Sequence, residues 1–118
     1  MSGLPLPQAL KALMGRRRAA RIPIRPGGPV AVVGANLVNV SPYGMMIHSP
    51  LPMEPDSVHR FRLVVAEEKK DVEARVANCL PKGKHHYGIG LEFIGVPEEF
   101  REQIALVLAP LSGHVSNS

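Results

Sequence analysis

The chain of 118 residues is poor in several features that would assign it to a common class. It contains a single cysteine, Cys79, so it can form neither an intrachain disulfide nor a cysteine-based zinc site. That cysteine usage fits a reducing, cytoplasmic setting. The chain has no tryptophan and only 4% aromatic residues, which argues against a surface that stacks several bases on aromatic rings.

Long apolar runs are also absent. None approaches the roughly 18 residues that a membrane-spanning helix requires. The first apolar stretch is interrupted by Pro5 and Pro7, and the basic cluster at residues 16–18 follows it instead of preceding it. A secretory signal has the opposite order, so we expect none here.

Motifs of catalysis are missing as well. Ser41 lacks the Gly-x-Ser-x-Gly context of a hydrolase nucleophile. His85 and His86 are adjacent, so in a strand they would face opposite sides and could not readily share a metal ion. Glu67 and Glu68 lie in a charged segment that is typical of a solvated loop. We therefore expect a protein that is not an enzyme and that holds neither metal nor cofactor.

Acidic residues are absent from the first 53 positions. That half of the chain carries six basic residues, whereas residues 54–118 carry eight basic and ten acidic ones, which gives a net charge of +4. Five of the six are arginines, whose planar guanidinium suits phosphates and base edges better than a lysine does. This asymmetry predicts an anionic partner for the N-terminal half.

The sequence is rich in short alternating segments typical of β-strands. They predict strands at residues 30–33, 37–40, 45–48, 59–65, 71–77 and 87–93, with polar hairpin loops at 67–70 and 81–84. Pro97 is expected to begin a helix with acidic residues in its first turn and an apolar stripe that reaches Leu111. Pro7 and Gly15 are expected to bound a short helix at residues 7–14, and residues 16–29 to form an extended linker.

This order of elements predicts one domain of the all-β class with flanking helices. We expect an antiparallel barrel of about six strands, with the C-terminal helix against it and a short N-terminal helix. The expected boundaries are an N-terminal helix or extension at residues 1–14, the barrel and its helix at 15–111, and a flexible tail at 112–118.

The first of two notable motifs is Arg17-x-x-x-Arg21, flanked by Arg16 and Arg18. In an extended chain, residues four apart point to the same side, roughly 13 Å from one another. Two guanidiniums on one side of a mobile strap could therefore grip a compact dianion from two directions. The alternative interpretation is a solvated basic linker.

The second motif is Asn39-x-Ser41-x-x-Gly44. Its segment Ser-Pro-Tyr-Gly matches a type I turn, with Ser first, Pro second and Gly fourth. Such a turn would project Asn39 and Ser41 from a rigid rim, and Gly44 would permit a backbone conformation or a close approach that a Cβ would block. The alternative interpretation is an ordinary hairpin turn.

In their order and spacing the two motifs resemble those of the PilZ domain family. The resemblance extends over about residues 15–109 and includes the segments Ile22-Pro23-Ile24 and Tyr87-Gly88-Ile89-Gly90-Leu91-Glu92-Phe93. It implies a six-stranded barrel that binds the bacterial second messenger cyclic di-GMP, as one molecule or as an intercalated pair. It further implies a bacterial, cytoplasmic receptor that relays the signal to a downstream effector protein.

Carried over residue by residue, the resemblance makes Arg17 and Arg21 the ligands of the strap, and Asn39, Ser41 and Gly44 the ligands of the rim. It also makes Arg16 and Arg18 auxiliary ligands and places Gly90 near the messenger. Asn39 departs from the aspartate common at its position: an amide has one acceptor oxygen and one donor, whereas a carboxylate accepts at both oxygens. We expect binding to survive this change.

The expected mechanism is a population shift. Residues 15–25 are expected to be mobile until the ligand neutralises the arginines and folds the strap against the rim, which would reorient the N-terminal helix. Two alternatives stay open: a basic small barrel that binds nucleic acid, against which the shortage of aromatic residues argues, and an adaptor that attaches to a membrane surface through residues 4–21.

Overall fold

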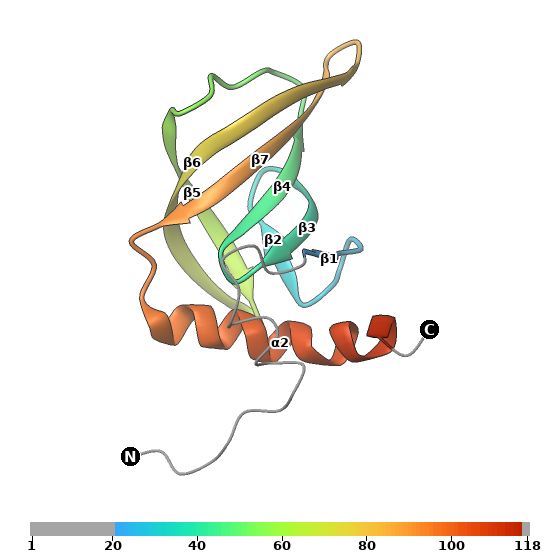
Figure 1. The fold of residues 1–118 in the computed structure, drawn as a ribbon, viewed down its shortest axis with the longest axis vertical. Helices are drawn as coiled ribbons and strands as arrows, with labels where there is room; N and C mark the ends of the chain where they lie inside the picture. The colour runs from blue at the N-terminus through green and yellow to red at the C-terminus, as the bar shows by residue number, and fades with distance from the viewer. Residues whose placement is uncertain (1–20, 117–118) are drawn as a thin grey trace.

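The structure, a computed structural model, describes residues 21–116 of the chain, with side chains described as far as residue 111 (Figure 1). This part contains seven strands followed by one helix. Their bounds are β1 Ile22–Pro23, β2 Val30–Val32, β3 Asn36–Ser41, β4 Gly44–Ser49, β5 Val58–Val65, β6 Glu68–Gly83, β7 His86–Ile94 and α2 Glu98–Ser116. The predicted N-terminal helix at residues 7–14 lies outside the described residues.

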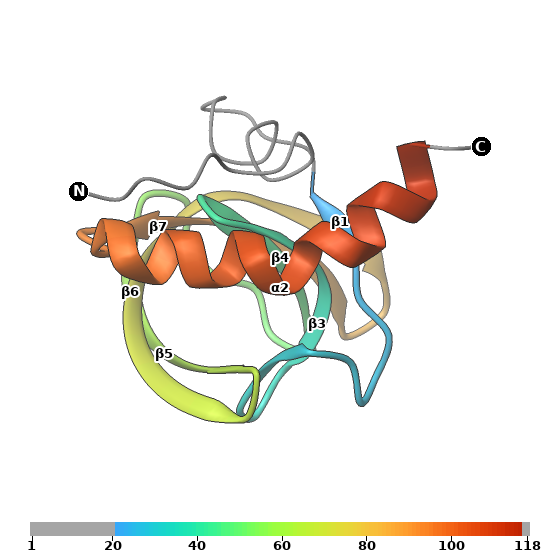
Figure 2. The same ribbon diagram turned by 90° about the horizontal axis from the view of Figure 1, so that it is seen from below.

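All seven strands form one antiparallel sheet with the order β1-β3-β4-β7-β6-β5-β2. The sheet curls strongly, and Figure 2 shows α2 lying across the open side of the curl. The predicted barrel-like all-β class with a C-terminal helix is thus confirmed. The described part has one strand more than expected, because β1 joins the edge of the sheet.

Period-two alternation places one face of each strand inside the curl. Val72, Ala74 and Val76 of β6 are buried, as are Ile89 and Leu91 of β7, in agreement with the predicted inward faces. Successive side chains of a strand point to opposite faces, so the residues that alternate with these buried ones point outward. Cross-strand partners share a face, so these outward residues together form the outer surface of the sheet. The candidate site lies on that outer surface.

Helix α2 closes the core with the apolar stripe that the sequence predicted. Phe100, Ile104 and Leu108 are buried against the sheet, and each contributes about 2 kcal/mol of burial free energy. Glu98 and Glu99 occupy its first turn, where negative charge is favourable. Within the part of the chain that the structure describes, no helix is long and apolar enough to cross a membrane.

The expectation about the hairpin loops was wrong, and the helix is longer than expected. Strand β6 begins at Glu68 and ends at Gly83, so most of both predicted hairpin loops is strand, because β5 and β7 supply ladder partners as far as these residues. Helix α2 continues to Ser116, into the expected flexible tail. Pro110 removes one backbone donor but does not end the helix.

The described end of the predicted mobile linker is anchored. Ile22 is buried and pairs with Val40, and the Ile24 amide donates to the Val38 carbonyl at 3.0 Å. Pro23 is tolerated in β1 because β1 is the edge of the sheet, where a missing donor leaves no ladder bond unmade. Residues 22–24 are thus paired with β3 in this structure, while the mobility expected for residues 15–25 stays a prediction, and residues 15–20 lie outside the described residues.

Candidate ligand-binding corner

The β3–β4 hairpin forms a tight corner at one end of the outer surface. Ser41 pairs with Gly44, and only Pro42 and Tyr43 lie between them. The Ser41 hydroxyl oxygen accepts a hydrogen bond from the Tyr43 amide at 3.1 Å, and the Phe93 amide donates to the Tyr43 carbonyl at 2.9 Å. Ser41 is buried. The corner is therefore held by one hydrogen bond inside the hairpin and by a second one from the neighbouring strand β7.

Gly44 is required by a close approach of two strands. A Cβ at this position would lie 2.3 Å from the Leu91 carbonyl oxygen and 3.2 Å from Arg21 Nη2. The backbone angles of Gly44 are not in the left-handed region. Of the two reasons that the sequence offered for this glycine, the structure therefore selects the lack of a side chain.

Arg21 reaches this corner from the end of the predicted strap. Its guanidinium packs over Gly44, and Nη2 donates to the Leu91 carbonyl at the long distance of 3.5 Å. Burial lowers the pKa of Arg21, and the nearby carboxylate of Glu92 opposes that change. The guanidinium is thus partly desolvated, and among residues 21–111 it makes one weak hydrogen bond, which leaves most of its donors available to an anion.

Asn39 lies two residues before Ser41 on the same outward face of β3. It pairs with Pro23 on one side and with Met46 on the other. Its Oδ1 is buried and accepts no hydrogen bond from any residue that the structure describes. An unpaired buried acceptor destabilises the folded protein by about 1–3 kcal/mol, so a donor that bonds this amide oxygen would be stabilising.

Gly90 belongs to the same cross-strand row as Asn39. Met46 pairs with both residues, and Gly90 pairs in turn with Asn78 of β6. A Cβ on Gly90 would lie 2.8 Å from the Asn78 Oδ1 atom, so the Asn78 amide leans into the space above the glycine. The outer surface above Gly90 is consequently covered by a polar amide.

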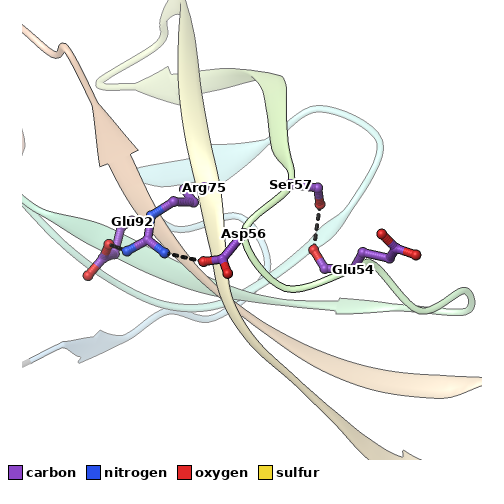
Figure 3. Close-up of polar contacts among 5 residues, drawn as sticks. All are labelled: Glu54, Asp56, Ser57, Arg75 and Glu92. Atoms are coloured by element: carbon purple, nitrogen blue, oxygen red, sulfur yellow. Dashed lines mark hydrogen bonds and ion pairs between the residues drawn. The ribbon is translucent and has the colours of Figure 1, made fainter.

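A second row on this face runs through the corner itself, from Ser41 and Gly44 to Glu92 and Arg75. Figure 3 shows the Arg75 guanidinium between two carboxylates. Its Nη1 donates to Asp56 at 2.7 Å, and its Nη2 donates to Glu92 Oε1. These bonds raise the pKa of Arg75, with Glu92 as the larger cause. The Glu92 carboxylate is therefore held at a defined place beside Gly44.

The corner also contacts the helix. Arg101 of α2 donates to the Pro42 carbonyl at 3.3 Å, and its guanidinium carbon lies 4.7 Å from the centre of the Tyr43 ring. A cation–π contact of this kind contributes about 0.5–1 kcal/mol at a surface site. The two loop residues of the corner thus rest on α2.

Arg21, Asn39, Ser41, Gly44 and Gly90 are brought together on one face of β3, β4 and β7. Arg16, Arg17 and Arg18 lie outside the described residues. Sequence reasoning missed Asn78, Arg75 and Glu92, which adjoin the same face. The outward phase of Arg75 and Glu92 was readable from the alternation, but their position next to Gly44 depends on cross-strand register, which no local pattern encodes.

A cavity of about 590 Å³ lies elsewhere, between β6 and the start of α2. Its lining mixes both charges, with Lys70 and Arg60 against Asp71, Glu73 and Glu99. None of the predicted site residues borders it. We therefore place the candidate site at the corner, where the polar groups converge, and not at this cavity.

Comparison with protein families identifies the family of the chain. The family model of the PilZ domain matches residues 15–109. The chain belongs to the PilZ domain family. The resemblance inferred from the two motifs is thereby confirmed. No match was found among curated proteins.

Solved structures of PilZ-like fold are similar to this chain at low sequence identity. The K. pneumonia MrkH–c-di-GMP complex superposes with a TM-score of 0.67 at 18% identity, over 86% of this chain and 55% of that one. MrkH in its apo state gives 0.57 at 16% identity, over 70% and 42% of the two chains. The uncharacterised Legionella protein Lpg0364 gives 0.54 at 16% identity, over 83% and 99%. This PilZ chain spans about half the length of the MrkH chain.

Proposed function

We propose that this PilZ domain binds cyclic di-GMP on the outer face of β3, β4 and β7. The observation that carries the proposal is the packing of the Arg21 guanidinium over Gly44, beside Asn39 and Ser41. The last arginine of the Arg-x-x-x-Arg motif thus meets the Asn-x-Ser-x-x-Gly corner, although 22 intervening positions separate Arg21 from Gly44 in the sequence.

The polar groups at the corner match this ligand in kind. Cyclic di-GMP offers two phosphate charges, and its guanines offer the O6 and N7 acceptor pair that one guanidinium can bridge. Arg21 supplies such a guanidinium, with most of its donors unused. The buried Oδ1 of Asn39 needs a donor, and the guanine N–H groups and the ribose hydroxyls are donors.

Further support comes from family membership and from MrkH, whose complex with c-di-GMP has the same fold. In this proposal Arg17 is the second ligand of the strap, with Arg16 and Arg18 as auxiliaries, and Gly90 lies beside the messenger. The domain acts by binding alone.

We further propose that binding is relayed to a partner protein through a change of conformation. Arg101 ties the Pro42–Tyr43 loop to α2, so a ligand that displaces the corner acts directly on the helix. The basic N-terminal segment, drawn onto the same face by the phosphates, would change the surface presented beside α2.

Isothermal titration of the full chain with cyclic di-GMP tests the proposal. We expect a saturable heat of binding in the wild type and an affinity at least tenfold weaker in Arg21→Ala, which corresponds to about 1.4 kcal/mol. Hydrogen exchange of the α2 amides should slow when the ligand is added to the wild type, and should stay unchanged in Arg21→Ala.

The matched control is Arg25→Ala, because Arg25 is an exposed arginine of the same segment that carries the same charge. It should bind within about twofold of the wild type. Heat indistinguishable from buffer at high micromolar ligand would reject cyclic di-GMP as the ligand. Equal losses in both arginine variants would reduce the role of Arg21 to general charge.

A further inference from the structure

The Glu92 carboxylate has a place in the site that no motif assigned to it. Gly44 of β4 pairs directly with Glu92 of β7, so the two residues are one strand spacing apart, about 4.8 Å, on the outer face. The Arg21 guanidinium packs over that same Gly44. A hydrogen-bond donor group and an acceptor group therefore stand side by side at the corner.

The orientation of Glu92 is constrained by Arg75. Arg75 Nη2 donates to Glu92 Oε1, while its Nη1 is anchored to Asp56 at 2.7 Å (Figure 3). Among the residues that the structure describes, Glu92 Oε2 accepts no hydrogen bond, and the side chain is 53% exposed. One carboxylate oxygen is thus fixed by the protein, and the other is accessible.

The charge of Glu92 is offset in part by Arg75, which also bonds Asp56. Arg75 bonds it on one side, and Arg21 experiences its field on the other. An anionic ligand that approaches Arg21 consequently meets a carboxylate flanked by two guanidiniums, not an isolated negative charge. Glu92 is therefore compatible with a phosphate-bearing ligand, and its second carboxylate oxygen stays accessible to a donor from that ligand.

The rim of a guanine offers partners to both the Arg21 guanidinium and the Glu92 carboxylate. Moving around the base, N7 and O6 are acceptors, followed by the N1–H and the N2 amino group, which are donors. A guanidinium matches the first pair and an adjacent carboxylate matches the second. Adenine presents an acceptor at N7, a donor at N6 and an acceptor at N1, so it would set like against like at both residues.

We propose that Glu92, positioned by Arg75, reads the donor edge of a guanine whose acceptor edge is read by Arg21. This inference rests on the proposed binding of cyclic di-GMP and assigns the base specificity of that site. Glu92 is then a specificity-determining residue, and Arg75 is a positioning residue that acts through it.

The test compares ligands that differ only in the donor edge. The full chain and its Glu92→Gln variant are titrated with cyclic di-GMP and with cyclic di-IMP, which lacks the N2 amino group. We expect Glu92→Gln to weaken cyclic di-GMP binding roughly tenfold and cyclic di-IMP binding less than threefold, because the lost bond to N2 exists only in the first complex. Arg75→Gln should lower the preference for cyclic di-GMP about threefold, a ratio that a merely structural role would not change.

Glu73→Gln is the matched control. Glu73 is a carboxylate of similar exposure on the outer face of β6, 3.7 Å from Arg60 and away from the corner. Its substitution should leave both affinities unchanged. Tighter binding by Glu92→Gln, or an equal loss for the two ligands, would overturn the inference while cyclic di-GMP binding stands. Failure of the wild type to bind would overturn the proposed function and this inference together.

Discussion

The outer surface of the sheet contains two regions that use the same residue types to different ends. On β5 and β6, arginines face carboxylates directly across the ladder. Arg62 Nε donates to Asp71 at 2.9 Å, and Arg60 lies 3.7 Å from Glu73. Both pairs are exposed, and each arginine is matched by a carboxylate.

At the corner of β3, β4 and β7, by contrast, polar groups of the described residues lack hydrogen-bond partners. Within the part of the chain that the structure describes, Arg21 has one long hydrogen bond to a carbonyl, and Asn39 Oδ1 has no donor. This difference is what distinguishes the proposed binding surface from a merely charged one. Polar groups that satisfy each other need no ligand, whereas partly desolvated groups without full partners raise the free energy of the free protein until a ligand supplies those partners.

We expect the largest effect on stability and on binding from Gly44→Ala, which disturbs the corner itself. The new methyl group would lie 2.3 Å from the Leu91 carbonyl oxygen, so β4 and β7 must separate at the corner. We expect the free energy of unfolding to fall by roughly 3 kcal/mol and cyclic di-GMP binding to be lost. Chemical denaturation and titration measure the two effects.

Gly83→Ala is the control for this substitution. Its new methyl group would lie 4.0 Å from the nearest atom, His86 Cβ, and its backbone is not left-handed. Its stability should stay within about 0.5 kcal/mol of the wild type. A small effect of Gly44→Ala, similar to that of Gly83→Ala, would contradict the close approach at the corner.

A smaller effect of opposite sign is expected from Asn39→Leu. The substitution removes a buried acceptor that lacks a donor, so the free protein should become more stable by about 1 kcal/mol, while its affinity for cyclic di-GMP falls. Thermal unfolding without and with ligand separates the two effects. Asn36→Leu, an exposed position of the same strand, should give no such gain. If Asn39→Leu destabilises the free protein, the Asn39 amide is not an unpaired group that costs stability.

The smallest effect concerns the ion pair between Arg62 of β5 and Asp71 of β6. The hydrogen bond from Arg62 lowers the pKa of Asp71, so the pair stabilises the folded state above the unfolded pKa, near pH 4, and this contribution disappears as the pH falls through the lower folded pKa. Stability of the wild type should therefore decline more steeply below about pH 4 than that of Arg62→Gln. Denaturation midpoints between pH 2 and pH 7 measure the difference. Parallel curves would show that the pair contributes nothing.

The predictability of the molecule follows the range of the interactions involved. The six strands and the helix that begins after Pro97 were predicted because alternation and the stripe from Phe100 to Leu108 are local patterns. Strand β1 was missed, since two residues with a proline form a strand only where β3 offers an edge. The full length of β6 was missed for the same reason, because its ends are strand only through their partners on β5 and β7.

The amino-acid sequence alone determined the family, the order of the strands along the chain and the residue types of the site, because motif spacing and alternation are properties of neighbouring positions. Tertiary structure decided which of those residues meet. It decided that Arg21 packs over Gly44 and that Gly44 is needed for contact with Leu91. It also decided that Glu92 and Arg75 join the corner. The physical reason is that sheet register depends on the fit of the whole core, and a shift of one residue would send each of these side chains to the opposite face.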